Sequence, residues 1–232
     1  MTDGYSYLWS ELAGLPVLAL ALAYAGNQRR TALIAGVLFT LFVSTDFIFE
    51  GNYWQPRRLF GWPLGIEDAL FGVRFGALCW LGTFWPWRRQ LRIGSPTLNS
   101  LWVAGLCAAA AALGVWLLSH VLGVMHAVIA IQAALAVFLM MVRPFLARCL
   151  LSGLILFPSY YALHVLLLAG LLPGFSAMWS GTEPYMATIM GIPLEEFLWT
   201  ASAGVCFPFL LAVACNLELE PPRRESRGAS RA

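Results

Sequence analysis

Two pairs of adjacent carboxylates are the residues of this chain best suited to proton chemistry. They are Glu67-Asp68 and Glu195-Glu196, and each pair lies at the beginning of a long apolar run. Inserting a charged side chain at the centre of a membrane helix costs about 2.5–3.5 kcal/mol of free energy on insertion scales. Acidic residues next to hydrocarbon are therefore unexpected unless they serve a function. We therefore expect the two pairs to contribute to a functional site that uses acid–base chemistry.

A simpler interpretation accounts for either pair taken alone. Carboxylates in the first turn of a helix are stabilised by the helix dipole. Pro193, just before Glu195, suits a helix that begins at that point. The presence of two matching pairs favours the site over this simpler interpretation.

Asp46 and His164 also occupy matching positions, because each follows an arginine, Arg30 or Arg148, by 16 residues. We expect Asp46 to belong to the acidic site. Two interpretations of His164 stay open, a hydrogen-bonded core histidine and a proton carrier. Arg74 lies within the apolar run that follows the first acidic pair, where a buried charge is expected to form a structural ion pair.

Aromatic residues accompany both acidic pairs. Phe71 and Trp199 each follow the second acid of a pair by three residues, and Phe75 and Phe197 are close by. Because the face of an electron-rich ring stabilises a cation, these four residues, together with His164, are candidates to line a substrate pocket. Most other tryptophans are expected to be interfacial anchors, among them Trp54, Trp62, Trp85, Trp87 and Trp179.

The elements that must position these residues are predicted to be membrane helices. Of the 232 residues, 60% are hydrophobic and 11% are charged, whereas a soluble domain carries about 25% charged residues. The backbone of a spanning segment must satisfy its own hydrogen bonds, which favours helices. The expected fold is therefore all-α, a polytopic membrane protein with about seven spans. These spans are 7–25, 31–49, 66–86, 101–119, 122–141, 149–172 and 192–215.

Arginine placement predicts the orientation of these spans. All 14 basic residues are arginine, and those outside the spans gather in every second loop and in the tail, except for Arg57 and Arg58. Since basic loops face the cytoplasm, we expect the N-terminus outside and the C-terminus in the cytoplasm of a multi-pass cell-membrane protein. The exceptional pair, Arg57 and Arg58, is expected to pair with Glu50 or to neutralise the carboxylates. No cleavable signal peptide is expected.

The chain also has the pattern of an internal repeat. Aligning the two acidic pairs gives a first three-span repeat at 1–100, a connecting span at 101–120 and a second three-span repeat at 121–217. The two repeats would be parallel, related by an axis along the membrane normal. Residues 218–232 are expected to form a disordered cytoplasmic tail.

The segment G-I-P-L-E-E-F-L-W (Gly191 to Trp199) carries a P-x-E-E motif at the head of the last apolar run. It resembles the lycopene cyclase domain of the heterodimeric and fused carotenoid cyclases of bacteria, archaea and fungi. The resemblance covers the whole chain in topology, and N-Y-W-Q-P-R-R-L-F-G (Asn52 to Gly61) leads into the first acidic pair. The first motif copy departs from the family pattern, since Gly65 replaces the proline and Asp68 the second glutamate.

The resemblance implies a carotenoid-biosynthesis enzyme that cyclises the end group of a polyene isoprenoid without redox change, as an isomerase or intramolecular lyase. In that reaction an acid protonates the terminal alkene and a base removes a proton after ring closure. We expect Glu195 or Glu196 to be the acid, with Glu67, Asp68 or Asp46 as base or cation stabiliser. The expected substrate is a hydrophobic terpenoid dissolved in the bilayer.

Other functions stay open at this point. They are another isoprenoid cyclase or a hydratase on the same fold, a proton-coupled transporter, and a non-catalytic membrane partner. A retinal Schiff base is excluded because the chain has no lysine. We expect no cofactor, metal or nucleic acid, since the five cysteines are scattered and neither G-x-G-x-x-G nor a P-loop is present. Gly72 and Gly76 suit helix packing or a homo-oligomer interface.

Overall fold

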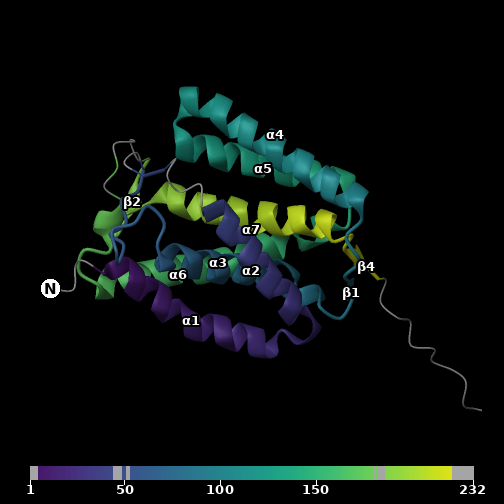
Figure 1. Cartoon of the computed structure of the whole chain (residues 1–232), viewed down its shortest axis with the longest axis horizontal. Coiled ribbons are helices and arrows are strands. Elements are labelled where there is room, and N and C mark those ends of the chain that lie inside the picture. Colours follow the sequence, from purple (N-terminus) through teal and green to yellow (C-terminus); the bar gives the residue numbers. More distant parts are fainter. Residues whose placement is uncertain (1–4, 44–48, 51–52, 180, 182–185, 221–232) are drawn as a thin grey trace, which may run out of the picture.

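The computed structural model describes the chain except residues 1–4, 44–48, 51–52, 180, 182–185 and 221–232. Within the described residues it is a helical bundle whose helices run roughly alongside one another (Figure 1). The helices are α1 (Ser6–Tyr24), α2 (Arg29–Val43), α3 (Ile66–Phe84), α4 (Leu98–Leu122), α5 (Val124–Val142), α6 (Leu146–Leu171) and α7 (Leu194–Ala214).

Five of these helices, α1, α4, α5, α6 and α7, are long and apolar enough to cross a membrane. A helix also forms at each of the other two predicted spans. However, α2 has 15 residues in the described part of the chain, and α3 carries Glu67, Asp68 and Arg74. The fold is therefore predominantly helical and compatible with a membrane protein, as the composition predicts.

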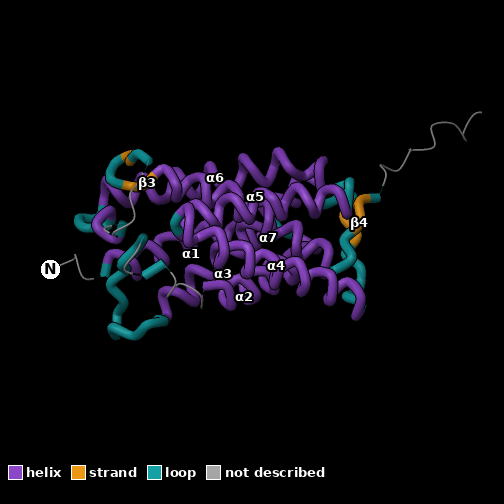
Figure 2. The backbone as a smooth tube through the Cα atoms, turned by 90° about the horizontal axis from the view of Figure 1, so that it is seen from above, coloured by secondary structure: helices purple, strands orange, loops and turns teal. Residues whose placement is uncertain are grey.

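Helices α3 and α7 form the centre of the bundle. Helix α3 packs on α1, α2, α6 and α7, and α7 packs on α3, α4, α5 and α6. Both central helices are largely buried, whereas α4 buries only Ser100 and Ala104. The view from above shows α3 and α7 inside the array of helices (Figure 2). The acidic pairs therefore lie on two largely buried helices at the centre of the bundle.

Small residues bring α2 and α3 into close contact. A Cβ atom added to Gly76 would lie 2.5 Å from the Phe39 Cβ and 2.6 Å from the Ala35 carbonyl oxygen, and one added to Gly72 would lie 2.6 Å from the Thr40 Cα. Any larger side chain at these positions would push the helices apart. The predicted helix-packing role of Gly72 and Gly76 is thus confirmed within the chain itself.

Two short antiparallel strand pairs lie at opposite ends of the bundle. At one end, β2 (Thr188–Ile189) pairs antiparallel with β3 (Ile192–Pro193). The intervening turn places Met190 and Gly191 at φ values of 53° and 79°, the left-handed conformation that a two-residue hairpin turn requires. Strand β3 leads directly into α7, so the hairpin fixes where the second acidic pair begins.

At the other end, β1 (Leu91–Arg92) pairs antiparallel with β4 (Glu218–Leu219). The Glu220 amide also donates to the Gln90 carbonyl. The prediction that a disordered tail begins at residue 218 is therefore wrong for its first residues, because the backbone after α7 finds a strand partner. Glu220 is also described, and the rest of the predicted tail, residues 221–232, lies outside the described residues.

Candidate active site

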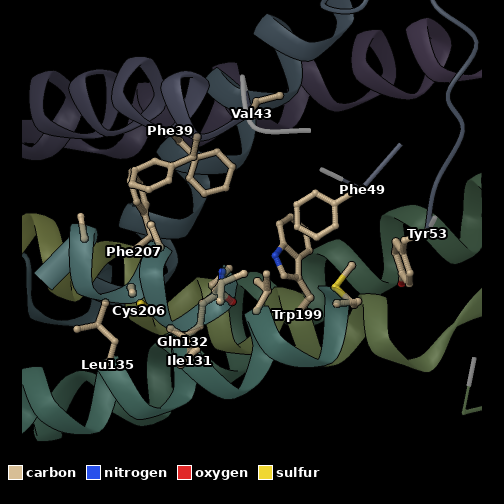
Figure 3. Close-up of a pocket in the computed structure, with 18 of the residues that line it drawn as sticks. Phe39, Val43, Phe49, Tyr53, Ile131, Gln132, Leu135, Trp199, Cys206 and Phe207 are labelled. Carbon is tan, nitrogen blue, oxygen red and sulfur yellow. The ribbon is translucent and has the colours of Figure 1, made fainter. Parts of the chain in front are cut away.

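A cavity of about 600 Å³ lies between α2, α4, α5 and α7, with Phe71 of α3 in its wall. Its α7 lining runs from Glu196 to Leu210, which at 1.5 Å per residue corresponds to a length of about 21 Å. Figure 3 shows this elongated space with Phe207 and Leu135 toward one end and Tyr53 and Phe49 toward the other. The cavity suits a long, narrow apolar molecule.

Among the residues that the structure describes, Glu196 is the acidic residue that lines the cavity. It occupies the third position of α7, where Pro193 precedes the helix, and its side chain is buried. Three neutral groups donate hydrogen bonds to it. The Tyr161 hydroxyl donates to Oε1 at 2.7 Å, and the Trp179 indole and the Tyr53 hydroxyl donate to Oε2 at 3.1 and 3.4 Å.

Glu196 forms no ion pair with any arginine or histidine in the described part of the chain. An ionised carboxylate buried without a cation is energetically unfavourable, although the three donors and the helix N-terminus partly compensate. Such a residue can hold a proton in an apolar setting and stabilise the anion that remains after giving it up. Glu196 therefore has the surroundings of a general acid.

Aromatic rings form much of the cavity wall. The two aromatics predicted from the motif copies meet there, with Phe71 stacked on Trp199 at a centroid separation of 6.4 Å and an interplanar angle of 17°. Phe75 lies 4.9 Å from Trp199 and supports it without lining the cavity. The other aromatic lining residues are Phe39, Phe42, Phe49, Tyr53, Trp54, Trp116, Tyr161 and Phe207. Their faces can stabilise a carbocation.

Glu195, next in the chain, faces different surroundings. It is fully buried, its Oε1 accepts from the Met186 amide at 2.6 Å, and Oε2 has no hydrogen-bond partner in the described residues. His126 at the beginning of α5 places its Nε2 atom 3.5 Å from Oε1. Glu195 does not line the cavity. Its contacts instead hold the segment that precedes β2.

Glu67 makes a contact of the same kind in the first half of the chain. It is fully buried, its Oε1 accepts from the Leu59 amide at 2.6 Å, and its Oε2 likewise has no hydrogen-bond partner among the described residues. A Cβ added to Gly65 would lie 2.3 Å from that Oε2 atom. The glycine that replaces the motif proline therefore leaves room for the Glu67 side chain.

Asp68 is held in an ion pair rather than in the cavity. The Arg58 Nε donates to Asp68 Oδ2 at 2.6 Å, and Arg58 also pairs with Glu50. The Tyr7 hydroxyl and the Gly65 amide complete the contacts of Asp68 at 3.1 and 2.6 Å. Burial works against the charge on Arg58, but the two carboxylates raise the pKa of its guanidinium above the ordinary value. The predicted pairing of Arg58 is confirmed, with both kinds of partner.

Arg74 also forms the predicted ion pair, with Glu11 of α1. Its Nε and Nη2 atoms each donate to a Glu11 oxygen at 2.9 Å, and both side chains are buried. Its Nη1 donates to the Tyr160 hydroxyl at 3.3 Å. A small cavity of about 20 Å³ lined by Glu11 and Arg74 shares Tyr161 with the large one. The ion pair thus lies behind the cavity wall.

The remaining predicted residues lie away from the large cavity or outside the described part. His164 stacks on Tyr160 at 5.7 Å, and its buried Nε2 has no hydrogen-bond partner among the described residues. Neither His164 nor Phe197 lines the cavity. Asp46 lies outside the described residues.

Sequence reasoning missed the three donors to Glu196. Trp179 was expected at the membrane interface, but it is 5% exposed. No sequence pattern marked Tyr53 or Tyr161 as a functional residue, although Tyr53 belongs to the Asn52–Gly61 segment that contributes to the resemblance to the lycopene cyclase domain. In the described ranges, no three histidine, cysteine or acidic side chains are grouped as metal ligands would be. No family model, curated protein or solved structure matches the chain.

Proposed function

We propose that this chain is a membrane-embedded enzyme that cyclises the end group of a linear polyene isoprenoid, in the manner of a lycopene cyclase. One observation carries the proposal. Glu196, a buried glutamate whose hydrogen-bond donors in the described part of the chain are all neutral, lies in the wall of a long cavity rich in aromatic rings. The resemblance of Gly191–Trp199 to the P-x-E-E motif supports the same assignment.

In the proposed reaction Glu196 begins as a protonated acid. It transfers its proton to the terminal carbon–carbon double bond, and the electron pair of that bond forms the new C–H bond. A tertiary carbocation results beside the aromatic wall, where Phe71 and Trp199 can stabilise it. The hydrogen bonds from Tyr161, Trp179 and Tyr53 stabilise the carboxylate left on Glu196.

The next double bond attacks the cation and closes the ring, which moves the positive charge onto the ring. Loss of a proton from the adjacent carbon forms the ring double bond and completes an isomerisation without electron transfer. The Glu196 carboxylate can accept this proton, which restores the acid for the next cycle. The candidate bases Glu67 and Asp68 do not line the cavity, so we assign them to holding the loops before α3.

The proposal includes seven membrane spans, made of α1 to α7, with the acidic end of the bundle outside. The N-terminal ends of α1, α3, α5 and α7 lie at one end of the bundle, and β4 lies at the other (Figure 1). An odd number of crossings would separate the chain ends in this way. Except for Arg57 and Arg58, the arginines that flank the helices lie at the end of the bundle opposite the acidic pairs, as a cytoplasmic face would require.

We also propose that α1–α3 and α5–α7 are two parallel repeats joined by α4. In both halves the first motif glutamate is fully buried and accepts a 2.6 Å hydrogen bond from a backbone amide of the preceding loop. Seven residues later, Arg74 contacts Glu11 of α1 and Ser202 contacts Gln132 of α5. The first contact is a buried ion pair, whereas Gln132 lines the large cavity.

A hydratase is a second candidate, favoured by Gln132. Its Oε1 accepts from the Ser202 hydroxyl at 2.7 Å, while the side chain lines an otherwise largely apolar space. The side-chain NH2 group of Gln132 could position a water molecule near the carbocation, and attack by water would give a tertiary alcohol. Product analysis separates the two reactions, because the alcohol has one more oxygen and two more hydrogens than the cyclised hydrocarbon.

Expression in cells that accumulate lycopene tests the proposed function. We expect monocyclic or bicyclic pigment from the wild-type chain, and a loss of about 10²–10⁴-fold with Glu196→Gln, the range typical of a general acid. Glu195→Gln is the matched control, because glutamine keeps the oxygen that accepts from Met186. Full cyclisation by the Glu196→Gln variant at normal protein levels would contradict the assignment.

A further inference from the structure

The large cavity reaches the side of the bundle between α2 and α4. Three residues both line the cavity and face the outside of the protein: Phe42 of α2, and Ala112 and Trp116 of α4. Phe42 is 46% exposed and Trp116 is 60% exposed. They mark the mouth of the cavity, which we call the lateral mouth.

The packing of the helices explains this opening. Helix α2 packs mainly on α3, and α4 packs on α5 and α7. The cavity therefore lies between α2 and α4, which pack mainly on different helices. On α4 the lining face carries Ala108, Ala111 and Ala112, whose small side chains leave the space open.

The position of the mouth along α4 sets the medium that it faces. Ala112 lies near the middle of Leu98–Leu122, a helix long and apolar enough to cross a membrane. A mouth at that depth would open to lipid hydrocarbon and not to water. Its apolar rim suits a molecule that is itself dissolved in the bilayer.

We propose that the lateral mouth between α2 and α4 admits one end of a linear polyisoprenoid directly from the bilayer. The inference rests on the proposed function. The cavity holds about 21 Å of chain along α7, so a longer polyene keeps its other end in the membrane while the first end reaches Glu196. Each binding event therefore presents one end group to the acid, and two rings require two separate events.

Purified wild-type protein in phosphatidylcholine liposomes that contain lycopene provides the first test. Ala112→Trp fills the mouth and lowers the rate of ring formation by about tenfold or more. Ala110→Trp is the matched control, because Ala110 is exposed, does not line the cavity, and lies about 160° around the helix from Ala112. The control keeps the wild-type rate. Equal rates for the two variants, with the wild type active, overturn the mouth but leave the proposed function standing.

Photo-crosslinking provides a second test that needs neither turnover nor a folded tryptophan variant. The probe is a linear polyisoprenoid with a diazirine on an internal unit, which lies in the mouth when the terminal unit reaches Glu196, dissolved in the same liposomes. We expect crosslinks at Phe42, Ala112 or Trp116 that excess lycopene removes, and background labelling at Ala110 that lycopene does not change. If the wild type forms no ring, the proposed cyclase activity fails, and lycopene-sensitive crosslinks still establish the mouth. Crosslinks at the mouth that lycopene leaves unchanged overturn it in either case.

Discussion

At the scale of single residues, what distinguishes Glu196 is the set of groups that surround its carboxyl. Its shortest hydrogen bond, 2.7 Å, comes from Tyr161. That tyrosine lies fully within the wall that separates the large cavity from the buried Glu11–Arg74 pair. In the proposed reaction, Tyr161 therefore fixes the direction in which Glu196 presents its proton and stabilises the resulting carboxylate.

Tyr161→Phe should slow ring formation with little effect on folding. Loss of one hydrogen bond worth about 1–2 kcal/mol corresponds to about a 5- to 30-fold lower rate. Tyr160→Phe is the control, because its hydroxyl contacts Arg74 and not Glu196. Initial rates of lycopene conversion in liposomes, at matched protein levels, measure the difference. A larger loss in the Tyr160 variant than in the Tyr161 variant would contradict the role given to Tyr161.

The sequence could identify the acidic pairs but not select Glu196 among them. All four acids occupy the first turn of a helix, so local pattern treats them alike. Their differences come from distant partners: Tyr161 is 35 residues away and Tyr53 is 143 residues away from Glu196. The one charged partner that was anticipated, Arg58 for the carboxylates, lies only 10 residues from Asp68. Contact partners close together in the sequence were predictable, and those far apart in the sequence were not.

At the scale of elements, α1 is attached to α3 by a buried charge pair. Both Glu11 and Arg74 are at most 2% exposed, so neither can exchange its partner for water. Removing one member of a buried pair leaves the other charge uncompensated and costs about 3–5 kcal/mol, whereas replacing both by apolar residues is often neutral or stabilising. The pair also supports Tyr160, next to the residue that contacts Glu196.

Arg74→Leu should therefore lower the unfolding temperature of the purified protein strongly. The double variant Glu11→Leu/Arg74→Leu should recover most of that loss, because no buried charge remains. Thermal unfolding in detergent, followed by circular dichroism, gives both values. If the double variant were as unstable as the single one, the two side chains would be needed for their hydrogen bonds and shape instead of for charge compensation.

Helix positions were more predictable from sequence than the roles of the segments between them. The predicted spans 66–86 and 192–215 nearly coincide with α3 and α7, because long apolar runs leave little choice of structure. The segment before α7 was not anticipated as a hairpin, since its turn uses Met190 at positive φ, a conformation that methionine rarely adopts. The β1–β4 pair depends on contacts between segments far apart in the chain and has no local signal.

At the scale of the whole molecule, the cavity lies at one of two unequal contacts between the proposed halves. On one side α3 meets α6 closely, where a Cβ added to Gly82 would lie 2.8 Å from the Phe157 Cβ. On the other side α2 faces α7 across the large cavity, touching it through Phe39 and Phe207 at a centroid distance of 4.9 Å. In the proposed duplicated fold, one contact is therefore filled and the other is open, and Glu196 is the one acidic residue that lines the open side in the described part of the chain.

The charge distribution over the ends of this bundle makes a definite prediction for its orientation. Arg88 and Arg148 lie at the end opposite the acidic pairs and rest on Trp85 and Trp87, with guanidinium-to-ring distances of 5.1 and 5.0 Å. At the acidic end, the charge of Arg58 is balanced by Asp68 and Glu50. Arg58 should therefore contribute little to keeping the acidic end in the cytoplasm. The arginine-rich end is therefore expected in the cytoplasm and the acidic end outside.

A fluorescent protein that matures only in the cytoplasm, fused after Ala232 of the full chain, should be bright, and the same fusion before Met1 should be dark. Alkaline phosphatase, which is active only outside the cytoplasm, should give the reverse result at the two ends. Seven crossings require opposite results at the two ends, because only an odd number of spans separates them. Equal results would mean that α2 or α3, the two helices with the shortest or most charged spans, does not cross. A missing α3 crossing would place the motif acids on opposite faces of the membrane, whereas a missing α2 crossing would leave them on the same face.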